Sequence, residues 1–213
     1  MITSATKLAK ILASVEEKNK EFKKSTKPQQ RVLVAQDVLA QIKAKRYVAE
    51  PGEWAYPIYS EAMRALPASN ESAQKLFANQ SIKTCNVCAL GGLFMSCTNL
   101  NNNTTFTELE DALCLGHSLD GGEKLSNGLN RIFTKKQLIL IENYFENEEG
   151  FFQSGIVTKM TDHINLFNDK YPNPQARLKE IMNNIVENNG TFVPSKLKVS
   201  KELSYFKLLG KEV

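Results

Sequence analysis

The sequence predicts an all-α, or nearly all-α, protein that forms a single compact helical domain with an amphipathic N-terminal helix. Apolar residues recur three and four positions apart in several segments, which is the spacing of one helix face. Prolines and glycines lie between these segments and mark their ends. We find no internal repeat. A parallel sheet would need strand and helix patterns that alternate, and no such alternation is found. We divide the 213 residues into an N-terminal helix at 1–27, a helical core at 28–194 and a C-terminal tail at 195–213.

Composition and charge argue against several classes of function. No run of 18 apolar residues occurs, and the N-terminus lacks the layout of a secretory signal, so we expect a cytoplasmic protein without a membrane partner. Three of the four cysteines lie in one apolar stretch, which is not a disulfide framework and fits a reducing compartment. The net charge is +4, with basic clusters at 18–27 and 196–211. Both contain glutamate, so we interpret them as solvated faces, with weak anion binding as the alternative and no nucleic-acid partner expected.

Two helices are expected before residue 47. The first spans 6–24 and ends ahead of Lys27-Pro28, because the residue before a proline avoids the helical region. It can pack on its own core or on a second copy of the chain, which leaves a homo-oligomer open. The second helix spans 29–46. The apolar stripe consists of Leu8, Ile11, Leu12 and Val15 in the first helix, and of Ala35, Val38, Leu39 and Ile42 in the second.

Residues 47–59 contain two prolines, a glycine and the only tryptophan of the chain, and we expect an ordered loop here. An aromatic loop of this kind either fills a core or lines a pocket. In a pocket, the ring of Trp54 would stack on the base of a nucleotide-like ligand.

The most apolar stretch, 84–99, is interpreted as one central helix with Thr84 as its N-cap. Its two glycines cost about 1 kcal/mol each relative to alanine, a cost that a sequence keeps where a backbone contact needs the room. One face of this helix is a seam of small residues, which fits either tight helix packing or a ligand or reactive thiol at the start of the helix. On a helical wheel, the small residues of one face are Cys85, Cys88, Ala89, Gly92 and Ser96.

The second half of the chain contains further helix signals. Thr105 and Thr134 each precede a Glu or Gln by three positions, which is the spacing of a capping box, so a helix is expected to begin at each. Gly190 is expected at the C′ position that ends the last helix. The other expected elements are short helices at 61–66 and 70–79, a glycine-rich loop at 117–128, and helices at 154–167 and 175–189. The inner face of the helix from 134 to about 147 consists of Leu138, Ile141, Tyr144 and Phe145.

Zinc is one alternative for the cysteines. Cys85 and Cys88 form one pair of ligands, and Cys114 and His117 form a second pair 25 residues further on. Three cysteines and a histidine are an accepted structural zinc set, although the first pair lies in an apolar helix and not in a knuckle. We assign no metal ligand and no cofactor.

A nucleophilic cysteine is the second alternative. Cys88 lies near the start of the predicted helix, where the macrodipole lowers the pKa of a thiol. The general base would be His117 or His163, the only histidines of the chain. The competing interpretation is a buried, unreactive thiol, so no catalytic residue is assigned.

A pocket for an anion or nucleotide is the third possibility. The helix starts at Thr84, Thr105 and Thr134 offer free N–H groups, and the loop at Asp120 could wrap a ligand. No Walker or dinucleotide-binding glycine motif supports it. The residues expected to bind the ligand are Cys88, Gly92, Trp54, Asp120, Asn168 and Asp169.

Cys88-Ala-Leu-Gly-Gly-Leu93 resembles the start of a helix in a loose group of small bacterial and phage proteins of unassigned activity. The group shares a Cys-Ala-x-Gly-Ala-Leu motif and an Asn-Asp pair, matched here by Asn168-Asp169, and this chain departs from the motif at Gly92. Residues 177–192 are similar to the C-terminal stretch of the phage members. The resemblance implies a phage or prokaryotic setting, and hence the host cytoplasm if a phage encodes the chain, but no mechanism.

These observations lead to one functional hypothesis. We expect a non-enzymatic accessory protein, in an anti-defence role, that binds a small nucleotide-like ligand or a host protein near the helix start at Cys88. A cysteine enzyme and a zinc-stabilised interaction domain remain the alternatives.

Overall fold

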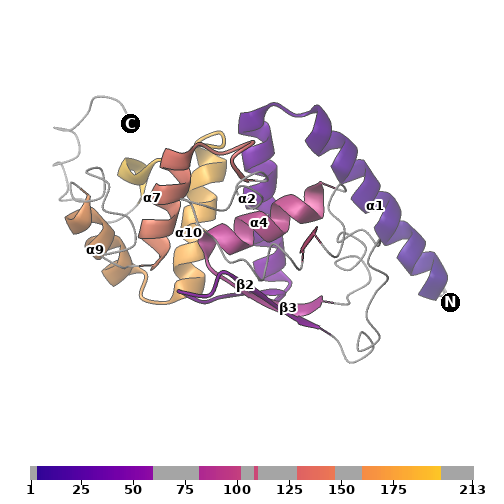
Figure 1. Ribbon diagram of the computed structural model, residues 1–213, viewed down its shortest axis with the longest axis horizontal. Coiled ribbons are helices and arrows are strands. Elements are labelled where there is room, and N and C mark those ends of the chain that lie inside the picture. Colours follow the sequence, from indigo (N-terminus) through magenta and orange to yellow (C-terminus); the bar gives the residue numbers. More distant parts are fainter. Residues whose placement is uncertain (1–3, 60–81, 102–107, 110–128, 147–159, 198–213) are drawn as a thin grey trace.

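The computed structural model describes residues 4–59, 82–101, 108–109, 129–146 and 160–197 (Figure 1). Within these residues the chain is mostly helical and contains one three-stranded sheet. The prediction of a mainly helical fold is confirmed, and the prediction of a purely helical one is wrong. The helices are α1 (Ser4–Lys24), α2 (Lys27–Lys43), α4 (Ala89–Leu100), α7 (Lys135–Glu146), α9 (Thr161–Lys170) and α10 (Pro174–Glu187), with a 3-10 turn η2 (Pro194–Lys196). The strands are β1 (Tyr47–Ala49), β2 (Ala55–Tyr59) and β3 (Ile82–Val87).

The sheet occupies the stretch that the sequence analysis assigned to an aromatic loop and to the first part of a helix. β3 lies in the middle, parallel to β1 and antiparallel to β2, so the strand order is β1-β3-β2. Tyr47 of β1 and Pro57 of β2 both pair with Cys85 of β3. The aromatic and β-branched residues of 47–59 are the types that favour strands, and this signal outweighs the prolines.

A bulge explains why β3 resembles a helix in the sequence. Two successive residues of β2 pair with Thr84 and Ile82, so Lys83 is passed over. The buried residues Ile82 and Cys85 are therefore three positions apart, which is a helical spacing and not the alternation of a regular strand. The predicted helix over 84–99 begins only at Ala89.

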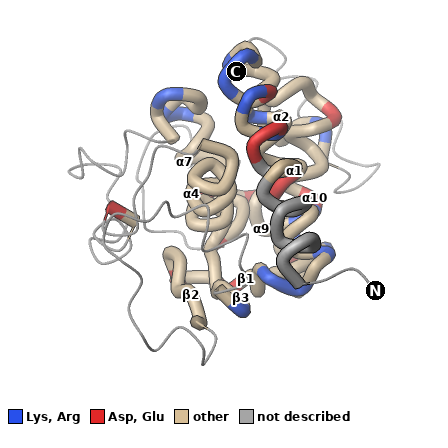
Figure 2. The backbone as a smooth tube through the Cα atoms, turned by 90° about the vertical axis from the view of Figure 1, so that its right-hand side faces the viewer, with Lys and Arg blue, Asp and Glu red and all other residues tan. Residues whose placement is uncertain are grey.

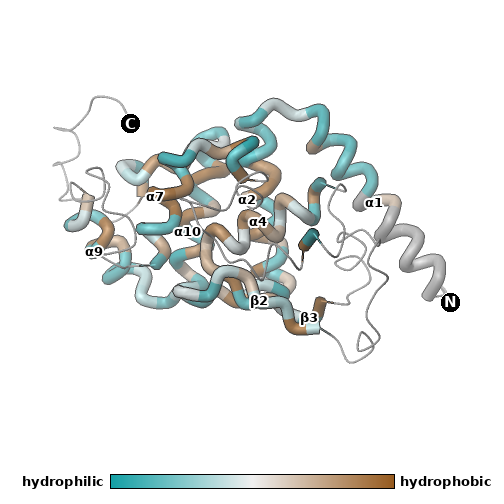
Figure 3. The backbone as a smooth tube through the Cα atoms, viewed as in Figure 1, coloured by the Kyte–Doolittle hydropathy of each residue, from teal (hydrophilic) through white to brown (hydrophobic). Residues whose placement is uncertain are grey.

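The core lies between α4 and the helices α2, α7 and α10, and Figure 3 shows the hydrophobic residues along these elements. α10 packs against α2, and the inward residues of α7 are buried as predicted. The fully buried side chains of α10 are Leu178, Ile181, Met182 and Ile185. A polar contact joins α2 to α4, since the amide of Asn99 donates to the buried carboxylate of Asp37 at 3.2 Å.

The edge of the sheet at β1 is closed by a side chain from α10. The backbone N–H of Ala49 donates to Oε1 of Gln175 at 2.9 Å, and Nε2 of Gln175 donates to the carbonyl of Tyr47 at 3.5 Å. An edge strand otherwise presents unpaired backbone groups. Gln175 therefore anchors the first turn of α10 to the sheet.

The end of α10 differs by one residue from the prediction. Asn189, with φ of 53°, occupies the C′ position, and Gly190, with φ of 85°, follows it. The N–H of Gly190 donates to the carbonyl of Ile185 at 2.8 Å, and that of Asn189 to Val186 at 3.3 Å, the pair of bonds of a Schellman motif. Asparagine tolerates the left-handed region, so Asn189 can occupy C′, and Gly190 adopts the positive φ of the position after it.

The helices expected at 6–24, 29–46, 134–147 and 175–189 are confirmed within a few residues at each end. The helix expected at 154–167 is described only from 160, and there α9 continues to Lys170. The short helices at 61–66 and 70–79, nearly all of the helix from 105 and the loop at 117–128 lie outside the described residues. No helix in the part of the chain that the structure describes is long and apolar enough to cross a membrane. The division into an arm, a core and a tail stays a prediction.

Candidate functional site

Cys88 ends the sheet and begins the central helix. It is the N-cap of α4, and its Sγ accepts a hydrogen bond from the N–H of Gly91 at 3.3 Å. The side chain is 1% exposed. Burial raises the pKa of the Cys88 thiol far above its ordinary value, and the charges of Glu146 and Glu142 act in the same direction. The thiol is therefore protonated at neutral pH, the opposite of the shift that a nucleophile needs.

The prediction that Cys85 belongs to a helical seam of small residues is wrong, because Cys85 lies on a strand and not on the helix. The closest backbone approach is at Gly91, where a Cβ atom would lie 1.5 Å from the carbonyl oxygen of Trp54. At Gly92 a Cβ atom would meet Val87 at 3.6 Å, an ordinary van der Waals contact. The start of α4 is thus packed against the segment that leads into β2, and Gly91 is the position that requires glycine.

His163, a candidate base, lies on α9 and is 4% exposed. Its Nδ1 lies 2.7 Å from the hydroxyl of Tyr144 on α7, in a buried hydrogen bond. Burial lowers the pKa of His163 and raises that of Tyr144 well above the ordinary range. The pair connects α7 with α9. His117 lies outside the described residues, so the alternative base stays a prediction.

The proposed zinc set is only partly described. Cys85 on β3 is buried, its thiol lies 3.6 Å from the carbonyl oxygen of Asn86, and burial raises the pKa of the thiol to about 12. Cys114 and His117 lie outside the described residues. Among the residues that are described, no group of three metal-ligating side chains occurs. Zinc stays an untested prediction.

Of the other residues expected to bind a ligand, Trp54 lies beside the start of α4, whereas Asn168 and Asp169 lie on α9. Trp54 packs against Phe94 of α4, with ring centroids 5.4 Å apart. Asn168 on α9 is buried and donates from Nδ2 to the carbonyl of Ile164 at 2.9 Å, while Asp169 beside it is exposed. Asp120 is outside the described residues. Cys88, Trp54 and the two glycines therefore form one packed junction.

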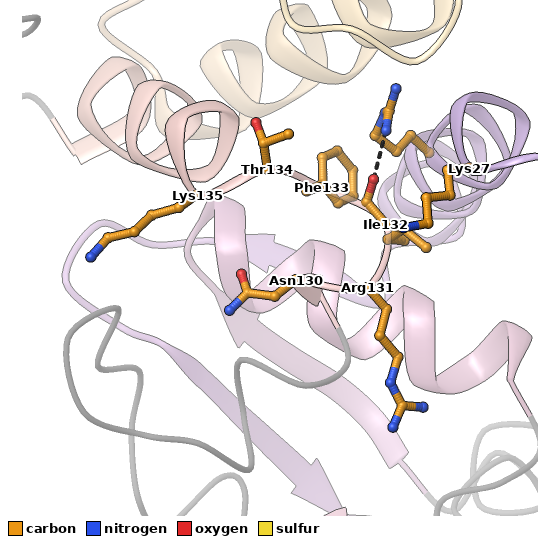
Figure 4. A pocket seen from close by; sticks show the side chains of 8 residues that line it. Lys27, Asn130, Arg131, Ile132, Phe133, Thr134 and Lys135 are labelled. Carbon is orange, nitrogen blue, oxygen red and sulfur yellow. Dashed lines mark hydrogen bonds between the residues drawn. The ribbon is translucent and has the colours of Figure 1, made fainter.

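A cavity of about 360 Å³ lies at a different place, between the starts of α2 and α7 (Figure 4). Four of its eight lining residues are cationic, and none of the eight is acidic. Figure 2 shows lysine and arginine at the turn between α1 and α2 and near the start of α7. The lining consists of Lys27, Arg31, Asn130, Arg131, Ile132, Phe133, Thr134 and Lys135.

Two helix N-termini face this cavity. Thr26 precedes α2, and its N–H donates to the side chain of Gln29 at 2.9 Å. Thr134 precedes α7, and its hydroxyl accepts from the N–H of Gln137 at 3.2 Å, which is half of the predicted capping box. The first turns of both helices contain lysine and no acidic residue. Each N-terminus carries about +0.5 charge, so the helix ends and the side chains combine into one region of positive potential.

Arg31 holds the wall of the cavity. Its Nη1 donates to the carbonyl of Ile132 at 2.6 Å, its Nε donates to the carbonyl of Gly190, and its guanidinium lies 6.0 Å from the centre of the Phe133 ring. Burial lowers its pKa. Arg31 therefore ties α2 both to the turn after α10 and to the segment before α7.

This cavity is not apparent from the sequence. Thr134 was predicted as a helix start with free N–H groups, and Lys27 as part of a basic cluster. No local pattern indicates that 129–135 lies beside α2, because the lining residues come from stretches about 100 positions apart in the sequence. Comparisons with protein-family models, with curated proteins and with solved structures found no match.

Proposed function

We propose that the protein is a non-enzymatic binding protein for a small ligand that carries phosphate groups. The site of binding is the cavity between the starts of α2 and α7, in place of the helix start at Cys88. The observation that carries the proposal is a cavity with four cationic lining residues and no acidic one.

The electrostatics of the two helix starts support this choice. Lysine in the first turn of a helix is unfavourable, typically by about 0.3–1 kcal/mol at an exposed site, because the macrodipole already places positive charge there. Lys27 and Lys135 stand at the first positions of α2 and α7. A bound phosphate would relieve both repulsions, because its negative charge is favourable at the positive end of a helix.

The packing at Cys88 argues for moving the site. Cys88, Gly91 and Gly92 are buried, and the backbone of Trp54 fills the space beside Gly91. A ligand there would have to displace the segment before β2, whereas the cavity at Lys27 and Arg131 is open to solvent through exposed side chains.

The biological setting of the proposal follows from the resemblance to bacterial and phage proteins. In that setting, a protein that binds a nucleotide-like compound without converting it acts by lowering the free concentration of the compound. A role against host defence is consistent with this action.

Isothermal titration calorimetry with ATP at low ionic strength tests the proposal. We expect binding to the unmodified chain, at least tenfold weaker binding by the double variant Lys27→Gln/Arg131→Gln, and unchanged binding by Lys43→Gln. Lys43 is a matched control, because it is an exposed lysine at the other end of α2 and does not line the cavity. At a ligand concentration 100 times Kd, the ligand should add about 2.7 kcal/mol to the free energy of unfolding. No binding, or equal binding by all three proteins, would contradict the proposal.

A further inference from the structure

The chemistry of the cavity lining restricts which part of a ligand it can recognise. The lining offers ammonium, guanidinium, amide and hydroxyl groups, which donate hydrogen bonds, and no carboxylate. Phosphate oxygens only accept hydrogen bonds, so they match this set. The carbonyl of Ile132, an acceptor in the wall, already receives a hydrogen bond from Arg31. The lining is therefore suited to phosphate.

Among the described residues, the aromatic lining of the cavity provides no stacking surface. Phe133 is the only aromatic lining residue, and its side chain is 2% exposed and lies beside the guanidinium of Arg31. Trp54, which the sequence analysis expected to stack on a base, packs against Phe94. A base stacks on an exposed ring face, so a nucleoside has no such partner among the lining residues.

The cationic groups are spread out and do not converge. In Figure 4 the side chains of Arg131 and Lys135 leave the segment 130–135 in different directions, and Lys27 extends from α2. A single phosphate is small relative to this spread, whereas a chain of two or three linked phosphates is longer and can pair with more than one cation.

We infer that this cavity recognises the phosphate chain of its ligand and leaves any nucleoside part in solvent, so that its ligand class is the polyphosphates, whatever base they carry. The inference rests on the proposed function and specifies the substrate class of the same site. Lys27 and Arg131 contact the phosphates. Arg31 is a positioning residue, because two of its donor atoms are engaged with backbone carbonyls.

Calorimetric titrations with a series of probes test the inference on the unmodified chain. The series is inorganic phosphate, pyrophosphate, tripolyphosphate, ATP, TTP and adenosine. We expect Kd to fall by about threefold or more with each added phosphate, as for exposed ion pairs. ATP, TTP and tripolyphosphate should bind within about threefold of one another, and adenosine should not bind. Raising the salt concentration should weaken all of these interactions, because the lining cations are exposed to screening ions.

The variants separate contact from positioning. Lys27→Gln and Arg131→Gln should each weaken tripolyphosphate binding and reduce its dependence on salt concentration, with little change in the unfolding midpoint. Arg31→Lys retains the charge and should lower the unfolding midpoint. At a temperature where this variant is folded, the salt dependence of its binding should stay as in the unmodified chain.

The outcomes distinguish the two levels of the argument. If no phosphate compound binds, both the proposed function and the inference fail. If ATP binds but tripolyphosphate does not, or if adenosine binds, the proposed function stands and the inference is wrong. If a short oligothymidylate binds more tightly than tripolyphosphate and depends on Lys27 and Arg131, the ligand is a nucleic-acid strand and the inference is also overturned.

Discussion

The junction at Cys88 and the cavity at Arg31 are built in opposite ways. At the junction, the buried small residues that begin α4 pack against the segment that contains Trp54, and backbone atoms close the space between them. The cavity consists of exposed cations from two distant stretches, and one arginine holds its wall. An unusual sequence motif can therefore mark a packing requirement, while ordinary surface residues from distant stretches assemble a cationic cavity.

The largest expected effect is on thiol chemistry in the closed junction. In a Cys114→Ser variant only Cys85, Cys88 and Cys97 remain, and all three are buried with pKa values raised, to about 12 for Cys85 and Cys97. Their reaction with a disulfide reagent at pH 8 should be about a thousandfold slower than that of a free thiol, because the thiolate is the reactive form. Stopped-flow absorbance measures the rate, with urea-unfolded protein as the control.

A fast native reaction of Cys88 would show that the junction is open. It would also restore the hypothesis of a nucleophilic cysteine.

A methyl group at Gly91 should damage the junction more than any change in the cavity damages the fold. Gly91→Ala places Cβ against the backbone carbonyl of Trp54, which cannot move aside without shifting β2. We expect a loss of about 3 kcal/mol or more in the free energy of unfolding, from urea denaturation. Gly92→Ala is the matched control and should be neutral or stabilising by up to about 1 kcal/mol.

Equal losses from the two glycine variants would mean that α4 does not approach the segment before β2 as described. A loss confined to Gly92→Ala would place the close contact one residue further along.

The wall of the cavity should depend on the shape of Arg31 as well as on its charge. Arg31→Lys cannot reach both carbonyls, and we expect a loss of about 1–3 kcal/mol in the free energy of unfolding. Urea denaturation measures this loss. An unchanged midpoint would show that the two hydrogen bonds do not contribute to stability.

The buried pair of His163 and Tyr144 should make the free energy of unfolding depend on pH. Burial lowers the pKa of His163 below its unfolded value of about 6.5, so the unfolded chain binds more protons below that pH. The contribution of neutral His163 is therefore present above about pH 6.5 and is lost as the pH falls. Urea denaturation at pH 7 and at pH 5 should show a smaller decrease for His163→Gln than for the unmodified chain. Equal decreases would assign the pH dependence to other groups.

The smallest expected effect concerns the exposed cations. Lys27→Gln and Arg131→Gln should each change the free energy of unfolding by less than about 0.5 kcal/mol, since both side chains are exposed. A slight stabilisation of Lys27→Gln is expected, because the lysine opposes the helix dipole of α2. Thermal unfolding without ligand checks both variants. A large loss would mean that these cations stabilise the fold and are not held available for a ligand.

The helices were predictable because their signals are local. The stripe of Leu178, Ile181, Met182 and Ile185 and the capping residue Thr134 specify α10 and the start of α7 within a few residues of chain. The sheet was missed because the bulge at Lys83 gives β3 a helical spacing of buried residues. The cavity was missed because nothing local to Lys27 indicates that Arg131 returns beside it.

The long reach of Arg31 also has a consequence for biosynthesis. Its two carbonyl partners lie 101 and 159 positions further along the chain. On a translating ribosome, α1 and α2 emerge first, but the wall beside them lacks its second anchor until Gly190 has left the exit tunnel. Premature termination anywhere in α10 would therefore release a chain that contains all of the lining residues without the turn that holds their wall together.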